Sequence, residues 1–423
     1  MRLGGGGQGI VTRGGVGLAL LAAVAALSGC GSNHKVPNRI PGETLTIYTS
    51  VPLRGASSVS GQAVLGGARI ALDQIDGRIG HYRIVLRWMD DSTAKRGSWD
   101  PGQTTINAHQ AMNDPTTIGY IGEYNSGASA ISIPLLNRMG IPQISPTSTA
   151  VGLTSHGIGA APGEPEKYYP TGIRTYARVV PSDAIEATAQ VRLQQQAGCA
   201  KTYILDDGEF DGDDAEASFQ VAARTAHLKL AGVQTFDPRV KDYRQLATGV
   251  AKTGADCVLI SAITEDNAVL LTKQVAQAMP NAKLFGTAGL AESTFADPEQ
   301  GGIPRSLDPR VLITAAALGP SASPPSGRSF YDRYQLQYGA PEPYAIFGYE
   351  AMSLMLSAIA RATDDGTAPA QRSKVRGAIF STKARRSVLG TYSIKPDGDT
   401  TLRRYGVYRI VGGRLRFWKQ IDG

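Results

Sequence analysis

The sequence predicts an α/β protein with two similar lobes, each a doubly wound parallel sheet covered by helices on both faces. Two observations predict this class. Short apolar segments alternate with segments whose apolar residues recur at helical spacing, as in strand–helix units. This alternation runs through residues 44–144 and returns in residues 202–285. Parallel strands are buried beneath crossover helices, so two successive series indicate two lobes within the 423 residues.

The first series starts with a strand and is punctuated by proline. Pro115 ends a helix and Pro146 ends a short strand, because proline cannot donate a backbone hydrogen bond. The expected strands are Thr44–Thr49, Arg83–Trp88, Thr117–Gly122 and Ile141–Ile144. The expected helices are Ala63–Ile75, Gln103–Asn113 and Ala128–Met139.

The second series repeats these units and is followed by less regular segments. Its expected strands are Thr202–Leu205, Gly232–Phe236, Cys257–Ser261 and Lys283–Phe285. Its expected helices are Asp214–His227, Tyr243–Thr253 and Asn267–Ala278. A strand at Val311–Ala317, a long helix at Tyr349–Ala362 and β-like segments from Gly390 to Trp418 follow. Within the last of these, Lys395-Pro396-Asp397-Gly398-Asp399 predicts a hairpin turn.

The composition is that of an ordinary globular protein, with 42% hydrophobic and 19% charged residues. The net charge is +7, but Lys and Arg are scattered, so we expect a basic surface that does not bind nucleic acid. The five His and three Cys show no metal-ligand spacing. The mature chain contains no phosphate-binding loop, nucleophile elbow or zinc-protease motif. We therefore expect no metal, no cofactor and no enzyme activity.

The N-terminus is typical of an exported lipoprotein. Two arginines precede the apolar run Val16–Leu27, which is too short for a permanent membrane-spanning helix and suits a signal peptide. The run ends in Leu27-Ser28-Gly29-Cys30, which resembles the bacterial lipobox; an ordinary secretory signal with an incidental cysteine is the alternative. We expect a signal peptide at residues 1–29, a lipidated Cys30 that anchors the protein to the outer face of the cell membrane, and a tether at residues 30–43.

Two further cysteines, Cys199 and Cys257, lie just before or at the start of expected strands. Disulfides persist outside the cytoplasm. If the strands Thr202–Leu205 and Cys257–Ser261 are neighbours in a parallel sheet, the two cysteines lie at the same end and close enough to bridge. We expect this disulfide, and two buried free thiols are the alternative.

Several motifs, in order along the chain, carry a family resemblance. The strongest stretch is residues 118–154, IGYIGEYNSGASAISIPLLNRMGIPQISPTSTAVGLT. Here a strand leads to a serine-containing helix start and then to a second strand and turn. Arg178 to Asp183, Gly348-Tyr349-Glu350-Ala351 and Gly390 to Asp399 match further family motifs. Together with the lipobox, these segments resemble the branched-chain amino acid receptor family of ABC-transporter substrate-binding lipoproteins.

The resemblance implies the type I fold of periplasmic binding proteins, in which a three-stranded hinge joins two lobes that close around a solute. We expect the chain to cross between the lobes near Arg178, Leu318 and Thr391. The implied lobes are 44–178 plus 319–390 for lobe 1, and 179–318 plus 391–423 for lobe 2.

The resemblance also implies a function and its partners. The protein would be a monomer that captures a small amino-acid-like or related polar solute, such as an amide or an organic acid. It would deliver that solute to the permease and ATPase subunits of an ABC importer. A surface receptor that binds the solute and signals to a partner protein is the alternative, because one fold can host both roles.

The expected site in lobe 1 lies beyond the carboxyl ends of the strands, where open α/β sheets bind ligands. Ser126, Gly127 and Ala128 open a helix there, and the free N–H groups of a helix start suit a carboxylate. A simple N-cap role for Ser126 is the alternative. The resemblance adds further contacts to the same solute, at Thr147, Ser148, Thr149 and Ser60.

The expected site in lobe 2 departs from the family pattern. The resemblance places Phe210 and Ile263 where relatives carry aromatic residues, and Ala288 where amino-acid binders carry the Glu that meets the ligand ammonium. A buried ammonium without a counter-charge costs several kcal/mol. Either another acid replaces this Glu, or the solute has no α-ammonium. The acids near the expected site are Glu265, Glu123, Asp207, Glu209 and Glu292.

Overall fold

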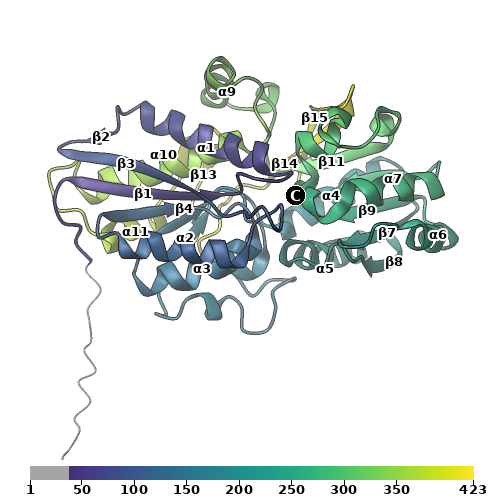
Figure 1. The fold of residues 1–423 in the computed structure, drawn as a ribbon, viewed down its shortest axis with the longest axis horizontal. Helices are drawn as coiled ribbons and strands as arrows, with labels where there is room; N and C mark the ends of the chain where they lie inside the picture. Colours follow the sequence, from purple (N-terminus) through teal and green to yellow (C-terminus); the bar gives the residue numbers. More distant parts are fainter. Residues whose placement is uncertain (1–37) are drawn as a thin grey trace, which may run out of the picture. The chain divides into compact units, whose positions relative to one another are not determined.

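The computed structural model describes residues 38–423, apart from the side chains of residues 210–214. The expected signal peptide, Cys30 and the tether up to residue 37 lie outside the described residues. Between residues 38 and 423, no helix is both long and apolar enough to cross a membrane. The described chain forms two main sheets with helices on their faces (Figure 1).

The first sheet has six strands in the order β2-β3-β1-β4-β5-β6, all parallel except for the antiparallel edge strand β2. Figure 1 shows α1 and α10 over one face and α2 and α3 over the other. The strands are Thr44–Val51 (β1), Arg78–Ile79 (β2), Tyr82–Asp90 (β3), Thr117–Ile121 (β4), Gln143–Ser145 (β5) and Tyr176–Arg178 (β6). The helices are Ser58–Asp73 (α1), Pro101–Asn113 (α2), Ser126–Arg138 (α3), Pro325–Tyr338 (α9), Ala345–Ala362 (α10) and Arg372–Phe380 (α11).

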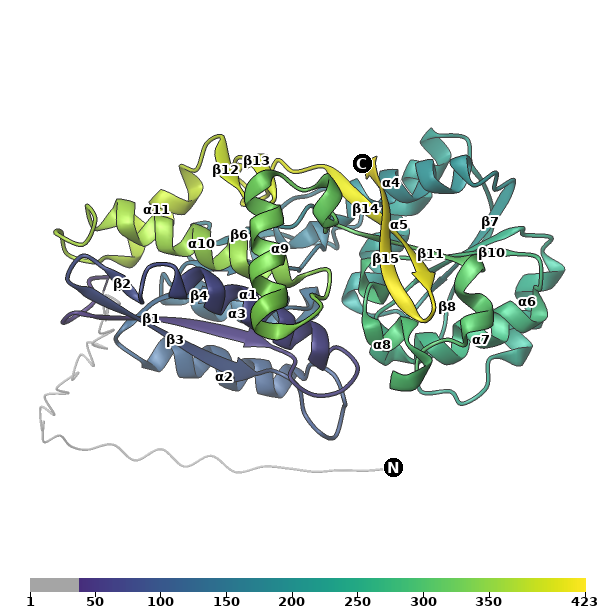
Figure 2. The ribbon, with the colours of Figure 1, turned by 90° about the horizontal axis from the view of Figure 1, so that it is seen from above.

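The second sheet has seven strands in the order β15-β14-β11-β10-β9-β7-β8. Its five strands from β11 to β8 are parallel, and the C-terminal hairpin β14–β15 joins them antiparallel (Figure 2). The strands are Lys201–Asp206 (β7), Lys229–Thr235 (β8), Cys257–Ser261 (β9), Lys283–Gly286 (β10), Val311–Ala315 (β11), Arg404–Val411 (β14) and Arg414–Asp422 (β15). The helices are Asp183–Gln196 (α4), Phe210–Thr225 (α5), Arg244–Lys252 (α6), Val269–Ala278 (α7) and Ser293–Ala296 (α8).

The chain passes between the two sheets three times. It leaves the first sheet after β6, returns after β11 to form α9, α10 and α11, and leaves again after the small hairpin of β12 (Arg385–Ser387) and β13 (Gly390–Tyr392). The predicted fold class, two α/β lobes of the type I kind, is therefore confirmed. The sheets are mixed rather than purely parallel, because antiparallel strands close one edge of each.

Two local features show why helices form where they do. Asp100 caps α2 by accepting from the N–H of Gln103 at 3.0 Å, and Pro101 follows at the first helical position, where its missing N–H costs nothing. Helices α1 and α10 cross at a point where only glycine fits. A Cβ added to Gly67 would lie 2.0 Å from the carbonyl oxygen of Ala345, inside any allowed contact.

The structure differs from the sequence-based expectations at three places. The sequence does not predict helix α9, because the Ser- and Pro-rich segment before it hides the helical pattern. Phe330, Tyr331 and Tyr334 form the buried face of this helix. Helix α11 was not expected either. The expected hairpin turn at residues 395–399 does close by a 2.8 Å backbone hydrogen bond, but its flanks form only an isolated bridge. The chain there is crossing to the second sheet, where β14 and β15 form the long hairpin.

The expected disulfide between Cys199 and Cys257 is present, with the two Cα atoms 5.8 Å apart. The disulfide lies at the starts of the two neighbouring strands, as the sequence predicts. Strands β7 and β9 are parallel neighbours, and Cys257 pairs in register with Thr202. The bridge joins the starts of these two strands to each other.

A buried arginine connects distant segments of the fold. The side chain of Arg178, at the end of β6, is fully buried and donates through Nε to Asp399 Oδ1 at 2.8 Å. Its Nη1 donates to the carbonyl oxygens of Ser148 and Ala150, and its Nη2 to Thr154. One guanidinium therefore joins the turn after β5 to residue 399, which lies on the third crossing between the sheets.

We predict that reduction of the disulfide lowers the stability of the second lobe. A bridge that closes a loop of 58 residues restricts the unfolded chain, which on the chain-entropy model contributes about 4 kcal/mol. A thermal unfolding scan with and without reductant, with cleavage verified by mass, measures the effect. The double variant Cys199→Ala, Cys257→Ala is the control and should not respond to reductant. An unchanged melting temperature of the fully reduced wild-type chain would contradict the prediction.

We also predict that Asp399→Asn destabilises the protein by about 3–5 kcal/mol, the range for removing one partner of a buried ion pair. Burial raises the pKa of Asp399, but the charge of Arg178 together with the hydrogen bonds from Thr154 and Arg178 and the charge of Lys395 lowers the pKa below its usual value. The pair therefore contributes stability above the unfolded pKa and loses it as the pH falls through the folded value. Denaturant titrations at pH 7 and pH 3 should show a large difference between wild type and variant at pH 7 only.

Asp237→Asn is the matched control for this prediction, because Asp237 makes an exposed pair with Arg239. Exposed pairs contribute little to stability. An equal loss of stability in both variants would show that burial of the Arg178 pair has no special effect.

Candidate functional site

A cavity lies where the two lobes meet at the carboxyl ends of their strands. Its empty volume, counting the part that is open to solvent, is about 560 Å³. From the first lobe it is lined by Ser57, Tyr124, Asn125, Thr147 and Thr149. From the second lobe it is lined by Asp183, Glu186, Ala215, Ser261, Ala262, Ile263, Thr287, Ala288, Gly289 and Glu292, and Tyr344 at the start of α10 adds to the wall from the first lobe.

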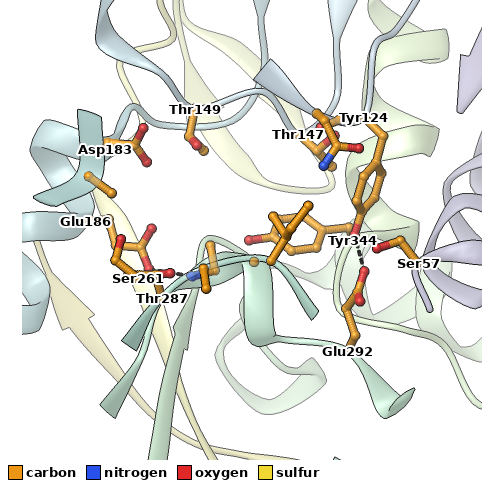
Figure 3. A pocket seen from close by; sticks show the side chains of 16 residues that line it. Ser57, Tyr124, Thr147, Thr149, Asp183, Glu186, Ser261, Thr287, Glu292 and Tyr344 are labelled. Atoms are coloured by element: carbon orange, nitrogen blue, oxygen red, sulfur yellow. Dashed lines mark hydrogen bonds between the residues drawn. The ribbon is translucent and has the colours of Figure 1, made fainter. Parts of the chain in front are cut away.

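Two carboxyl groups from the start of α4 stand at one end of this cavity (Figure 3). Glu186 Oε1 accepts from the N–H of Ala288 at 2.8 Å and from the hydroxyl of Thr314. Burial, followed by the negative charge of Asp183, raises the pKa of Glu186 to about 8. Ala288 itself has no carboxyl group, but Glu186 brings one to the backbone amide of Ala288 from helix α4.

A second acidic group stands at the opposite end. Glu292 Oε1 accepts from the hydroxyl of Tyr124 at 3.0 Å, and Figure 3 shows this bond across the cavity from Asp183 and Glu186. Burial, and then the charge of Glu265, raise the pKa of Glu292 to about 8. Glu265 itself accepts from the N–H of Ser57 at 2.9 Å. Both bonds connect the second lobe to the first.

The described lining contains no positively charged side chain. Among the described residues that line the cavity, none is Lys, Arg or His. Arg178 lies close enough to influence Asp183, but its guanidinium is held by Asp399 and three other acceptors. The cavity is therefore acidic at both ends, with hydroxyl groups and short apolar side chains between.

The structure brings together some of the residues predicted for the site and not others. Thr147, Thr149, Ile263 and Ala288 line the cavity. The side chain of Phe210 lies outside the described residues. Five predicted residues are buried and are not part of the lining, namely Ser60, Ser126, Gly127, Ala128 and Ser148.

Serine hydroxyls bind the backbone amides of the turn after β5, where the resemblance predicted contacts to the solute. The N–H groups of residues 147 and 148 donate to Ser145 Oγ, and those of residues 149 and 150 donate to Ser126 Oγ, at 2.9–3.2 Å. The turn after β5 thus satisfies its own backbone. At the helix start, Ala128 packs against Trp99 and against Ile263 of the second lobe, so that apolar groups cover it.

The other acids weighed from the sequence have internal roles. Glu123 is fully buried in the first lobe beside Asp91, and burial raises the pKa of Glu123 to about 7. Asp207 accepts from the N–H groups of Ile263 and Glu209, which fixes the loops after β7 and β9. Of the five acids, Glu292 alone is among the described lining residues.

Sequence reasoning missed Asp183, Glu186, Tyr124 and Tyr344 as site residues. A signal for the first two was present: two acids occupy the first turn of α4, immediately after a chain crossing. Acids are common at helix starts because the helix dipole stabilises them. The pattern alone therefore did not distinguish Glu186, which is buried at the cavity, from an exposed helix-start acid.

Comparison with known proteins agrees with this architecture. The sequence profile of the family described as periplasmic binding protein matches residues 44–414. A Leu/Ile/Val-binding protein, BraC3, of Rhizobium johnstonii is 22% identical over 373 residues, covering 88% of this chain and 93% of the relative. Leucine-binding protein LivK from Thermotoga maritima is 20% identical with a TM-score of 0.75, covering 89% of this chain and 99% of that one.

Two further solved structures share the fold at lower identity. LivJ from Streptococcus pneumoniae, in complex with isoleucine, is 16% identical with a TM-score of 0.74, covering 90% of this chain and 100% of that one. A solute-binding protein from Rhodopseudomonas palustris, in complex with p-hydroxybenzoic acid, is 16% identical with a TM-score of 0.72, covering 90% and 97%. The family profile spans most of the described chain, and the protein belongs to the periplasmic binding protein family.

Proposed function

We propose that this protein is the exported solute-capture subunit of an ABC importer, and that it holds a small polar solute in the acidic cavity between its lobes. The observation that carries the proposal is a cavity whose walls come from both lobes at the carboxyl ends of their strands. Such a site is complete only when the lobes meet, so hinge closure and solute capture are coupled. The permease and ATPase subunits would receive the closed, loaded form.

Direct contacts between the lobes support this coupling. Ser57 donates to Glu265, Tyr124 donates to Glu292, and the hydroxyl of Thr294 donates to the carbonyl oxygen of Ala56 at 3.0 Å. Trp99 of the first lobe packs against Ile263 of the second. Opening the hinge breaks these contacts, and a solute that bridges the two walls stabilises them.

We predict that the true solute raises the thermal stability of the protein and changes its tryptophan fluorescence. Binding at a hundred times the dissociation constant stabilises the folded state by about 2.7 kcal/mol. A panel of amino acids, amides, amines and organic acids, screened by thermal shift, identifies the class. The absence of stabilisation by any small molecule would contradict the proposal.

The fluorescence of Trp99 should change when the lobes close, because Trp99 lies at the contact between the lobes. In Trp99→Phe the fluorescence change should be lost while the thermal shift remains. Trp418→Phe is the matched control, since Trp418 is 41% exposed on β15 and should leave the change intact. The same fluorescence response in Trp99→Phe as in wild type would show that closure does not occur at this contact.

We also propose that Cys30 carries the lipid that holds the protein to the outer face of the membrane. Stable anchoring requires more than one acyl chain, which lipoprotein processing would supply at this cysteine. Cys30→Ala should release the protein from the membrane fraction into the soluble fraction. Cys199→Ala is the control and should stay bound. Unchanged fractionation of Cys30→Ala would refute the anchor.

A further inference from the structure

The charge pattern of the cavity narrows the chemical class of the solute; this inference rests on the proposed solute capture. Glu186 stands at one end and Glu292 at the other, with no cationic side chain among the described lining residues. Asp183 adds a further carboxyl group beside Glu186, and Glu265 lies behind Glu292. Buried acids without cations are stable only when they are protonated, as the raised pKa values of Glu186 and Glu292 allow, or when a bound group supplies the positive charge.

The turn after β5 offers no free backbone amides to a negative group. The four consecutive N–H groups of residues 147–150 are already bonded to Ser145 Oγ and Ser126 Oγ. The hydroxyl of Thr147 donates to the carbonyl oxygen of Tyr124 at 2.6 Å and is therefore also occupied. A solute carboxylate in this cavity would meet carboxyl groups at both ends.

Several buried polar atoms in the walls lack a partner, which independently points to a ligand. The hydroxyls of Ser261 and Tyr344 and the Oε2 atom of Glu292 are buried and have no hydrogen bond of good geometry to any described residue. All three residues line the cavity, and Figure 3 shows Tyr344 reaching between the two acidic ends. Buried polar atoms are normally hydrogen-bonded, so we expect a bound solute to supply the missing partners of these atoms.

The middle of the cavity is suited to a short hydrocarbon segment. Ile263, Ala262 and Ala288 contribute apolar surface from the second lobe. The ring of Tyr344 lies edge-on to that of Tyr124, with centroids 6.5 Å apart. An apolar centre between two acidic ends matches a molecule with a nitrogen cation at each end and methylene groups between.

We propose that the solute is a small linear dication of the diamine class, with no carboxylate, and that Glu186 and Glu292 each receive one ammonium group. Asp183 supports the first contact, and the hydroxyl groups of Ser261 and Tyr344 accept the remaining N–H bonds. This assignment differs in charge from leucine, isoleucine and p-hydroxybenzoic acid, the solutes of the structural relatives.

Calorimetric titration and thermal shift with 1,4-diaminobutane, 1,5-diaminopentane, butylamine, leucine and 4-hydroxybenzoate test the proposal. We expect the diamines to bind at least tenfold more tightly than butylamine, and leucine and 4-hydroxybenzoate not to bind. Tighter binding of leucine or 4-hydroxybenzoate than of either diamine would overturn the proposal but leave solute capture standing. Equal binding of butylamine and the diamines would overturn the two-ended contact. No binding by any compound of this panel or of the wider one would overturn both.

Two variants locate the contacts. Glu186→Gln and Glu292→Gln remove a charge but keep an oxygen that can accept from Ala288 or Tyr124. Each should weaken diamine binding at least tenfold while unfolding at a temperature near that of wild type without ligand. Glu299→Gln is the control, because Glu299 is an exposed residue paired with Arg305 outside the cavity, and it should bind diamines as wild type does. Unchanged diamine affinity in both cavity variants would place the dication elsewhere.

Discussion

The buried ion pair between Arg178 and Asp399 is the interaction on which the arrangement of the hinge and the cavity depends. A guanidinium with no exposed surface must have its donors satisfied, and Arg178 satisfies them on the turn after β5 and on the third crossing of the chain. The turn at residues 147–150 borders the cavity. Its position is therefore coupled to the hinge by direct hydrogen bonds, so a shift at either place strains the other.

The polar groups that line the cavity are determined by the hydrogen-bond partner that each buried polar group takes. In the first lobe, serine hydroxyls take the amides that a solute carboxylate would otherwise use. In the second lobe, Glu186 takes the amide of Ala288 and brings a carboxyl group to the site. Both choices place carboxyl groups at the cavity and leave few backbone amides free to donate. The family fold is thus kept while the groups that line the site vary, since fold and site chemistry are set by different residues.

The excursion at residues 156–172 contributes a further contact between the lobes. Tyr168 and Tyr169 are buried against Ile133 and Tyr176, and the hydroxyl of Tyr169 donates to the carbonyl oxygen of Leu153 at 2.7 Å. The segment is therefore packed onto the first lobe. Its residue Ile158 accepts from the hydroxyl of Ser218 on α5 of the second lobe, at 3.2 Å. The sequence showed only that this segment interrupts the strand–helix pattern.

The sequence by itself determined the α/β class, the two strand–helix series and the Cys199–Cys257 pairing, because hydrophobic periodicity and cysteine position are local signals. The resemblance to the family suggested Thr147, Thr149, Ile263 and Ala288 as site residues, and these four line the cavity. Only the tertiary structure decided which side chains line the cavity. Glu186 acts beside Ala288 from 102 residues away in the chain. Ser126 turns its hydroxyl to the next turn instead of the cavity. These side-chain positions depend on which residues, far apart in the sequence, pack together in the folded chain, and a local sequence pattern carries no information about that packing.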